Sequence, residues 1–448
     1  MARRLSGLAI LSFLMFGCSA RVENAEPVPD VASAFTDGEQ VAEDAKNDTG
    51  YVTSLDAAEV EFDIEGDIDG ENWDQEAPLQ VGQFALTYLR QNNDVYIQSL
   101  AEDYANGGDS VEWRDGDNWI PNSDRNVARH KPTHFRMRAV SGIIMHPGSR
   151  TALANRTYAP IVPVSPGTLF EEAGDKCGEP TGGIDVEQSV YWYLWAPSKR
   201  GCNARTQELS VKVARVLPAG RTVYPEYDRL LEDGEITAAV FFGQVDHGTL
   251  SDNDWGFGLI EDFETSITAA GFAKDESAEG IRYERTRNNV HSVIDIYTPR
   301  DFAGLDDYAH VHNFDDAVNS HEIVVWNGHS MLGASDFWAR ESIYNSDTAN
   351  QYQIFLYNGC LGYEYYVNPI LTGKGGWANV DIVSNALETP FIITVQETAS
   401  ALGAIMGSAE RGGTTSWKRI LGSMNRIGSG DAIYGASGVR DNAFRPRR

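Results

Sequence analysis

Two short stretches of the chain decide its fold: residues 323–329 (IVVWNGH) and residues 354–360 (IFLYNGC). Each is a run of large apolar residues that ends in Asn-Gly and then in one reactive side chain. An apolar run of this length, bounded by a turn signal, is typical of a buried parallel strand. The 30 residues between His329 and Cys360 are enough for a loop, a helix and the return that parallel neighbours require.

The two reactive side chains follow from this strand prediction. In open α/β sheets, ligands bind beyond the carboxyl ends of the strands. Neighbouring strands of this kind would bring the imidazole of His329 and the thiol of Cys360 to one edge of the sheet, as a Cys-His nucleophilic pair requires. The alternative is structural: Cys360 is then a small core residue and His329 a strand-end histidine with its hydrogen bonds satisfied.

Strands and helices alternate in the carboxyl-terminal half. Residues 236–242 form an apolar strand pattern, and a helical pattern with one apolar face follows it. Further strands are expected near residues 281–283, 293–297 and 391–395, and a helix at residues 417–425. This alternation predicts an α/β domain over residues 230–448, a mostly parallel sheet flanked by helices.

Residues 51–225 have a different pattern. Period-two runs at residues 60–64, 94–98 and 209–213 are separated by Gly, Pro, Asn and Asp clusters, which predicts a β-rich, sandwich-like domain. Within it, residues 63–74 (DIEGDIDGENWD) are dense in carboxylates but lack the spacing of an EF-hand loop. The interpretations are a solvated acidic strand and turn, or a structural calcium site. No other cofactor and no metal at the catalytic site is expected.

The amino terminus has the features of an export signal. Arg3 and Arg4 precede the apolar residues 8–16, and Gly17 and Cys18 follow. Cys18 directly after the cut resembles a bacterial lipobox, which implies a signal peptide over residues 1–17 and lipidation of Cys18. Residues 18–50 are acidic and aperiodic, as expected of a disordered tether. The alternative is a plain secreted protein that is cleaved nearby.

The charge of the chain limits its partners. With 36 Lys and Arg against 65 Asp and Glu, the formal net charge is −29. Such a surface argues against nucleic acid or anionic lipid as a partner, because both are polyanions. No later stretch approaches the roughly 20 apolar residues that span a bilayer. We therefore expect attachment to the bacterial cell envelope, at the outer membrane, through the lipid alone.

The remaining cysteines separate into a pair and a single thiol. Cys177 and Cys202 lie in polar loop sequence of an exported domain, where a disulfide between them suits an oxidising compartment. Cys360 is then left over. An unpaired cysteine in an exported protein is a candidate reactive thiol.

The blocks around His329 and Cys360 resemble those of the caspase-like cysteine peptidases, nearest to the clostripain and gingipain type. In that group a hydrophobic strand ends in the histidine and the next strand ends in the catalytic cysteine. The resemblance covers about residues 230–430 and implies a three-layer caspase-like domain that hydrolyses protein or peptide substrates. It further implies that the backbone N–H groups of Cys360 and Ser330 form the oxyanion hole. Glu397, just beyond the expected strand 391–395, would shape the specificity pocket and favour Arg or Lys.

Two other functions compete with a cysteine endopeptidase. Residues 328–333 (GHSMLG) resemble a serine-hydrolase elbow, but the spacing is one residue too long and no histidine follows His329 in the chain. A non-catalytic surface lipoprotein is the remaining alternative. In that case the β-rich domain binds a glycan or protein, and the α/β domain is an inactive scaffold.

Overall fold

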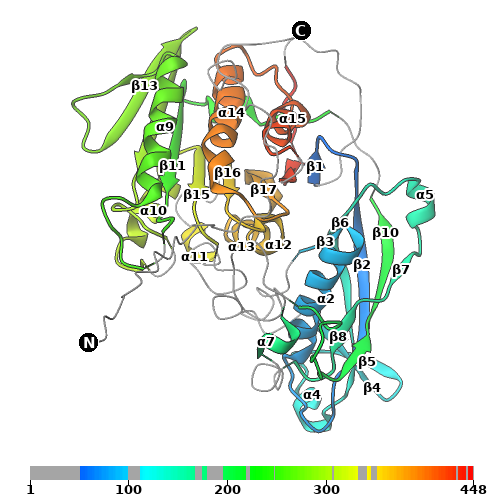
Figure 1. Ribbon diagram of the computed structural model, residues 1–448. Coiled ribbons are helices and arrows are strands. Elements are labelled where there is room, and N and C mark those ends of the chain that lie inside the picture. The colour runs from blue at the N-terminus through cyan, green and yellow to red at the C-terminus, as the bar shows by residue number, and fades with distance from the viewer. Residues whose placement is uncertain are drawn as a thin grey trace, which may run out of the picture.

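The computed structural model describes residues 51–98, 111–166, 174–178, 195–217, 222–246, 248–304, 307–330, 341–344, 351–429, 432–439 and 442–446. The predicted signal peptide, Cys18 and the acidic tether lie outside these residues. The chain folds into a mixed α/β structure built on a large sheet and a smaller, antiparallel one (Figure 1).

The large sheet has nine strands in the order β1-β18-β17-β16-β15-β11-β14-β13-β12. Its five central strands, from β17 to β14, are all parallel to one another, and the two strands on each side of them pair with their neighbours in antiparallel fashion. The α/β fold predicted for the carboxyl-terminal half is thus confirmed, but its sheet is mixed, with a parallel centre, and is not mostly parallel. The strands are β1 (Tyr51–Thr53), β11 (Glu235–Phe242), β12 (Ala273–Lys274), β13 (Ile281–Arg287), β14 (Val290–Tyr297), β15 (Ile323–Asn327), β16 (Gln353–Asn358), β17 (Val380–Asn385) and β18 (Tyr434–Ser437).

The strand order reverses at β11, the first parallel strand along the chain. The second parallel strand, β14, pairs with one edge of β11, and the third, β15, pairs with the other edge. Such a reversal is a topological switch point, where open α/β sheets hold ligands beyond their carboxyl ends. His329 follows β15, one of the two strands that form this point.

Helices cover both faces of the sheet. Buried residues of α9, α14 and α15 share one hydrophobic cluster with the side chains on one face, such as Val240 and Leu356. The other face packs with α10 to α13 through a second cluster that contains Phe241 and Phe355. The helices are α8 (Tyr227–Leu230), α9 (Trp255–Ala269), α10 (Val311–Val318), α11 (Glu341–Tyr344), α12 (Gly362–Tyr365), α13 (Val367–Gly373), α14 (Phe391–Ala409) and α15 (Trp417–Ile427).

The amino-terminal domain has one main antiparallel sheet, in the order β5-β4-β6-β2-β10-β7 with β3 also on β6. Within the described residues of this domain, the second layer is helix α2 with the ribbon β8–β9, and no second large sheet such as a sandwich would have is present there. Pro78 in the first turn of α2 is a helix-start signal. The elements are β2 (Ala57–Asp67), α2 (Ala77–Asn93), β3 (Val95–Ile97), β4 (Val111–Asp115), β5 (Asn118–Pro121), α4 (Arg125–His130), β6 (His134–Met145), α5 (Arg150–Leu153), β7 (Thr157–Tyr158), β8 (Ile161–Pro163), α7 (Gly174–Cys177), β9 (Thr206–Glu208) and β10 (Ser210–Val216).

The two halves of the chain are not separate bodies. Strand β1, which precedes the amino-terminal domain, pairs with β18 at the edge of the large sheet. In addition, the core of the amino-terminal domain is continuous with the cluster on the α10 to α13 face. The predicted disulfide between Cys177 and Cys202 is confirmed and closes a loop of this domain.

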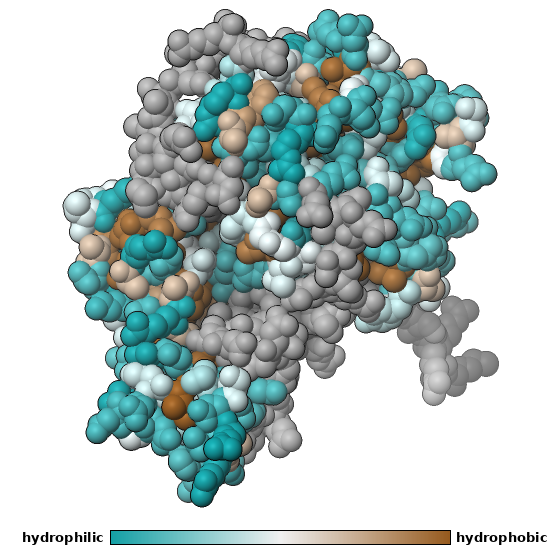
Figure 2. Space-filling view, turned by 180° about the vertical axis from the view of Figure 1, so that it is seen from behind, coloured by the Kyte–Doolittle hydropathy of each residue, from teal (hydrophilic) through white to brown (hydrophobic). Residues whose placement is uncertain are grey.

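The surface agrees with the hydrophilic composition. Figure 2 shows a back face that is largely hydrophilic, with hydrophobic residues in small separate groups. Among the described residues, the large hydrophobic side chains that are well exposed are Trp255, Tyr308 and Ile392. No helix in the described part of the chain has both the length and the hydrophobicity needed to cross a bilayer.

Candidate functional site

The strands that precede His329 and Cys360 lie side by side. β15 and β16 are parallel, every residue of both is buried, and Asn327 is the register partner of Asn358. Each reactive residue follows its asparagine by two positions. The sequence therefore predicted correctly that the two segments leave the sheet from neighbouring strands at the same edge.

The two asparagines also bond to each other through their side chains. Asn358 Nδ2 donates to Asn327 Oδ1 at 3.0 Å and to Thr398 Oγ1 at 2.8 Å, and Thr398 Oγ1 donates to Asn327 Oδ1 at 2.6 Å. Asn327 Nδ2 donates to the carbonyl of Phe241 at 3.2 Å. All three polar side chains are fully buried. This network joins the carboxyl ends of β11, β15 and β16 to α14, directly before the two reactive residues.

His329 is held by the segment that follows β11. Its Nε2 lies 2.8 Å from the carbonyl oxygen of Val245. A carbonyl can only accept, so Nε2 carries a proton, and in the neutral ring the basic lone pair is on Nδ1. The ring of Phe391 packs edge-on against the imidazole, with 4.9 Å between ring centroids. Both the tautomer and the ring plane of His329 are therefore fixed by neighbours.

Cys360 is a buried cysteine outside the disulfide, and it precedes a strained residue. Its side chain is 3% exposed. Leu361 has φ 55° and ψ 32°, the left-handed region, which costs a non-glycine residue about 1–2 kcal/mol. The N–H of Leu361 donates to the carbonyl of Leu387 at 2.9 Å, and helix α12 then begins at Gly362. The helix expected after Cys360 is present, but it has only four residues.

Ser330 and Gly359 bring the two segments into direct contact. The hydroxyl groups of Ser330 and Tyr357 share a hydrogen bond of 2.6 Å. A Cβ atom added to Gly359 would lie 2.4 Å from Ser330 Oγ and 2.4 Å from the Tyr357 ring. The residue after His329 thus touches the residue before Cys360, and only glycine fits there. The backbone N–H groups of Ser330 and Cys360, the predicted oxyanion donors, belong to these touching segments.

Glu397 lies on a helix, α14, and is buried there. The run at residues 391–395 was expected to be a strand, and this prediction was wrong, because α14 begins at Phe391 directly after Pro390. Glu397 is fully buried, and its Oε2 accepts a 2.7 Å hydrogen bond from the hydroxyl of Tyr434. Burial raises the pKa of Glu397 well above its ordinary value. The carboxyl is a core group in this structure and does not line an open pocket.

A buried hydrogen bond between an arginine and a glutamate links the amino-terminal domain to the segment after Cys360. Arg90 Nη1 on α2 lies 2.7 Å from Glu364 Oε2 on α12. Burial raises the pKa of Glu364 to about 8, although Arg90 opposes this increase. No periodicity or motif in either segment predicts the contact, because the partners are 274 positions apart.

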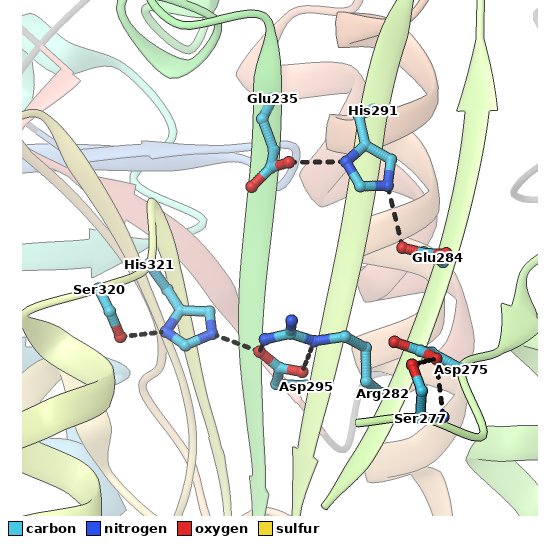
Figure 3. A network of polar contacts seen from close by, with 9 residues as sticks. All are labelled: Glu235, Asp275, Ser277, Arg282, Glu284, His291, Asp295, Ser320 and His321. Carbon is cyan, nitrogen blue, oxygen red and sulfur yellow. Dashed lines mark hydrogen bonds and ion pairs between the residues drawn. The ribbon is translucent and has the colours of Figure 1, made fainter. Parts of the chain in front are cut away.

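A second polar cluster lies on the strands β11, β13 and β14 and on the segments that precede β13 and β15 (Figure 3). His291 is bonded to Glu235 at 2.6 Å and to Glu284 at 3.1 Å. Burial alone would raise the pKa of Asp295, but hydrogen bonds from Arg282 and His321 outweigh it and lower the pKa to about 2. The acids and bases of this cluster form hydrogen bonds with one another, which indicates a role in stability.

The acidic segment considered for calcium is bonded to protein groups instead. His134 lies 2.8 Å from Glu65 and 2.9 Å from Asp67, and Asp69 accepts from Ser165 and Arg205. Within the residues that the structure describes, no group of three or more His, Cys, Asp or Glu side chains is placed to hold a metal ion. Calcium binding by this segment stays an untested prediction.

Comparisons with known proteins identify no relative of this chain. No family model, curated protein or solved structure matches the chain.

Proposed function

We propose that this chain is a cysteine endopeptidase with Cys360 as nucleophile and His329 as acid and base, in a caspase-like α/β domain. One observation carries the proposal. The two reactive residues leave adjacent parallel strands in register, and their segments touch at Ser330 and Gly359. The bond from His329 Nε2 to Val245 supports it, because Nδ1 is then the nitrogen able to accept a proton.

The reaction would proceed through a thioester. The thiolate of Cys360 adds to the carbonyl carbon of the substrate, and the N–H groups of Cys360 and Ser330 stabilise the oxyanion. The imidazolium of His329 gives its proton to the leaving amine as the carbon–nitrogen bond breaks. Water, deprotonated by the neutral imidazole, then cleaves the thioester and restores the thiolate–imidazolium pair. No cofactor is required.

The setting of this activity is also a proposal. We place the protein at the bacterial cell envelope, held to the outer membrane by lipid on Cys18, with protein or peptide as substrate. Cys18→Ala tests the attachment, because it should move the protein from the membrane fraction to the soluble fraction. Recovery of the variant in the membrane fraction at the wild-type level would contradict the lipid anchor.

Thiol labelling with iodoacetamide tests the nucleophile. An ordinary thiol with a pKa near 8.5 is only about 3% thiolate at pH 7, so full ionisation can raise the labelling rate by at most about 30-fold. We expect Cys360 to react faster than a small model thiol between pH 6 and 7. His329→Ala should remove this advantage, whereas His312→Ala, on an exposed histidine of α10, should not.

Peptide hydrolysis separates the enzyme from its rival. Cleavage of a peptide library by the wild-type protein, lost in Cys360→Ala, would establish the endopeptidase. Labelling no faster than the model thiol, together with no cleavage, would favour the non-catalytic lipoprotein. The low exposure of Cys360 is the observation that favours this second function, because a buried thiol must first become accessible to a substrate.

A further inference from the structure

We infer that Asp254 is a positioning residue for His329, acting through the peptide group that joins Val245 to Asp246. The inference rests on the proposed function for its meaning in catalysis. Asp254 is 2% exposed and lies at the amino-terminal cap of α9, where its Oδ1 accepts from the N–H of Gly256 at 2.8 Å. Capping the helix is its local role.

The same carboxylate holds the segment that follows β11. Asp254 Oδ1 accepts from the N–H of Val245 at 3.0 Å, and Oδ2 accepts from the N–H of Asp246 at 3.0 Å. The side chain of Asp246 accepts in return from the N–H of Trp255 at 3.3 Å. One side chain thus accepts hydrogen bonds from two consecutive backbone N–H groups. Capping the helix requires neither of these two bonds.

The second of these bonds acts on the group that holds His329. The N–H of Asp246 and the carbonyl of Val245 belong to one planar peptide unit, so fixing one end orients the other. That carbonyl accepts the 2.8 Å bond from His329 Nε2. The result is a continuous chain of carboxylate, peptide group and imidazole. A carboxylate on the N–H side polarises the peptide and strengthens its carbonyl as an acceptor, since hydrogen bonds in series reinforce one another.

The close packing of α9 against the end of β11 supports this assignment. A Cβ atom on Gly256 would lie 2.6 Å from the carbonyl oxygen of Gly243 and 3.0 Å from Asp254 Oδ1. The first turn of α9 can approach β11 this closely only because residue 256 is glycine. The position of Asp254 relative to Val245 is therefore set by backbone contacts.

Asp254→Asn is the matching substitution. Asparagine is as good a helix cap as aspartate and keeps an oxygen for Gly256 and Val245, but its amide places a donor where Oδ2 accepts from Asp246. We expect kcat for peptide hydrolysis to fall about tenfold to 100-fold with KM nearly unchanged, by analogy with the loss of a hydrogen-bond partner that orients a metal-ligating histidine. The ¹⁵N and ¹H signals of His329 Nε2–H should shift or be lost.

Two controls separate positioning from stability. Asp124→Asn changes another capping aspartate, on α4, which accepts from Asn126 at 2.8 Å, and should leave kcat and the His329 signals unchanged. Asp254→Ser keeps a cap but has one oxygen for three N–H donors, so it should reproduce the loss of kcat. An Asp254→Asn protein with wild-type kcat and unshifted His329 signals would overturn the inference. If the wild-type protein cleaves no peptide, the proposed function fails, while the nuclear magnetic resonance shifts still decide whether Asp254 places His329.

Discussion

The buried pair of Arg90 and Glu364 predicts an asymmetry that can be measured. The two side chains are 6% and 0% exposed. A guanidinium stays charged at any accessible pH, whereas a carboxyl can take up a proton. Since burial already raises the pKa of Glu364 to about 8, this residue tolerates the loss of its partner by staying neutral. Arg90 cannot become neutral in this way and stays charged when Glu364 is removed.

The expected magnitudes follow from this difference. Glu364→Leu removes a hydrogen-bond partner from a buried guanidinium that stays charged, and should cost about 3 kcal/mol or more of unfolding free energy, because a charged group that loses a buried partner costs more than the about 1–3 kcal/mol of a neutral one. Arg90→Met leaves a carboxyl that can stay protonated, so the cost should be about 1–3 kcal/mol, that of a lost buried hydrogen bond. Removing both partners should cost less than Glu364→Leu alone, because well-packed apolar residues can replace a buried pair.

The pH dependence has a defined sign. A carboxyl whose pKa is raised on folding stabilises the folded state below its unfolded value, and this contribution is lost as the pH rises through the folded value. For Glu364 the loss extends from about pH 4.5 to about pH 8. Arg90 opposes the rise in pKa, so Arg90→Met should lose more stability at pH 8.5 than at pH 6.

The assay is urea unfolding of the wild type, both single variants and the double variant, followed by tryptophan fluorescence at pH 6 and pH 8.5. Arg215→Met is the control, because Arg215 pairs with Glu61 on the surface with 57% of its side chain exposed, and should cost about 0–1 kcal/mol. The reasoning is refuted if, at pH 6, Arg90→Met lowers the unfolding free energy by as much as Glu364→Leu or by more. Strictly additive costs in the double variant would refute it as well.

Four further outcomes follow from single features. Gly359→Ala should lower the rate of thiol labelling and the melting temperature, because its Cβ would overlap neighbouring atoms at 2.4 Å; wild-type values for both would contradict the contact. Reducing the disulfide of Cys177 and Cys202, 25 positions apart, should cost about 3 kcal/mol in urea unfolding, and an unchanged midpoint would show that it adds nothing. Hydrogen bonds that His291 donates to Glu235 and then to Glu284 raise its pKa, so its contribution to stability is present below about pH 6.5 and is lost at higher pH. His291→Phe should therefore lower the melting temperature more at pH 5.5 than at pH 9, and an equal loss would exclude this role. Asn289 turns the β13–β14 hairpin at φ 65°, so Asn289→Gly should raise the melting temperature slightly, whereas Asn289→Val should lower it.

The sequence was most informative where both faces of a strand are buried. β11, β15 and β16 each contain a continuous run of apolar residues because helices cover the sheet on both sides, and this pattern is visible without a structure. The pairing of Cys177 with Cys202 was equally accessible, because their setting and number allow few choices. Local composition and burial carry these predictions.

The same reasoning failed where local and tertiary preferences disagree. Residues 391–395 (FIITV) are rich in β-branched side chains, which favour a strand. They form the start of α14 instead. Pro390 directly precedes them, and buried side chains continue at helical spacing as far as Ile405. The helical spacing is visible in the sequence when residues 391–405 are considered together, but not in residues 391–395 alone.

The groups around the reactive residues could not be predicted, because they come from distant parts of the chain. Val245 is 84 positions from His329, and Arg90 is 274 positions from Glu364. Contacts over such distances in the sequence depend on how α2 and the loop that follows β11 pack in the folded protein. The periodicity of apolar residues does not indicate this packing. Asp254 could have been recognised as a helix cap, but its hold on the 245–246 peptide group could not.

The two Asn-Gly pairs show how a correct prediction can rest on an incomplete reason. They indicated that each strand stops, and the strands do stop there. Yet Asn327 and Asn358 are buried partners joined by a 3.0 Å hydrogen bond, and Gly359 is needed because Ser330 and Tyr357 crowd it. A slip of one residue between β15 and β16 would break the bond and turn each side chain to the other face. This bond fixes the register in which Asn327 pairs with Asn358. The same register therefore places His329 and Cys360 side by side in sequence position, each two residues beyond its paired asparagine.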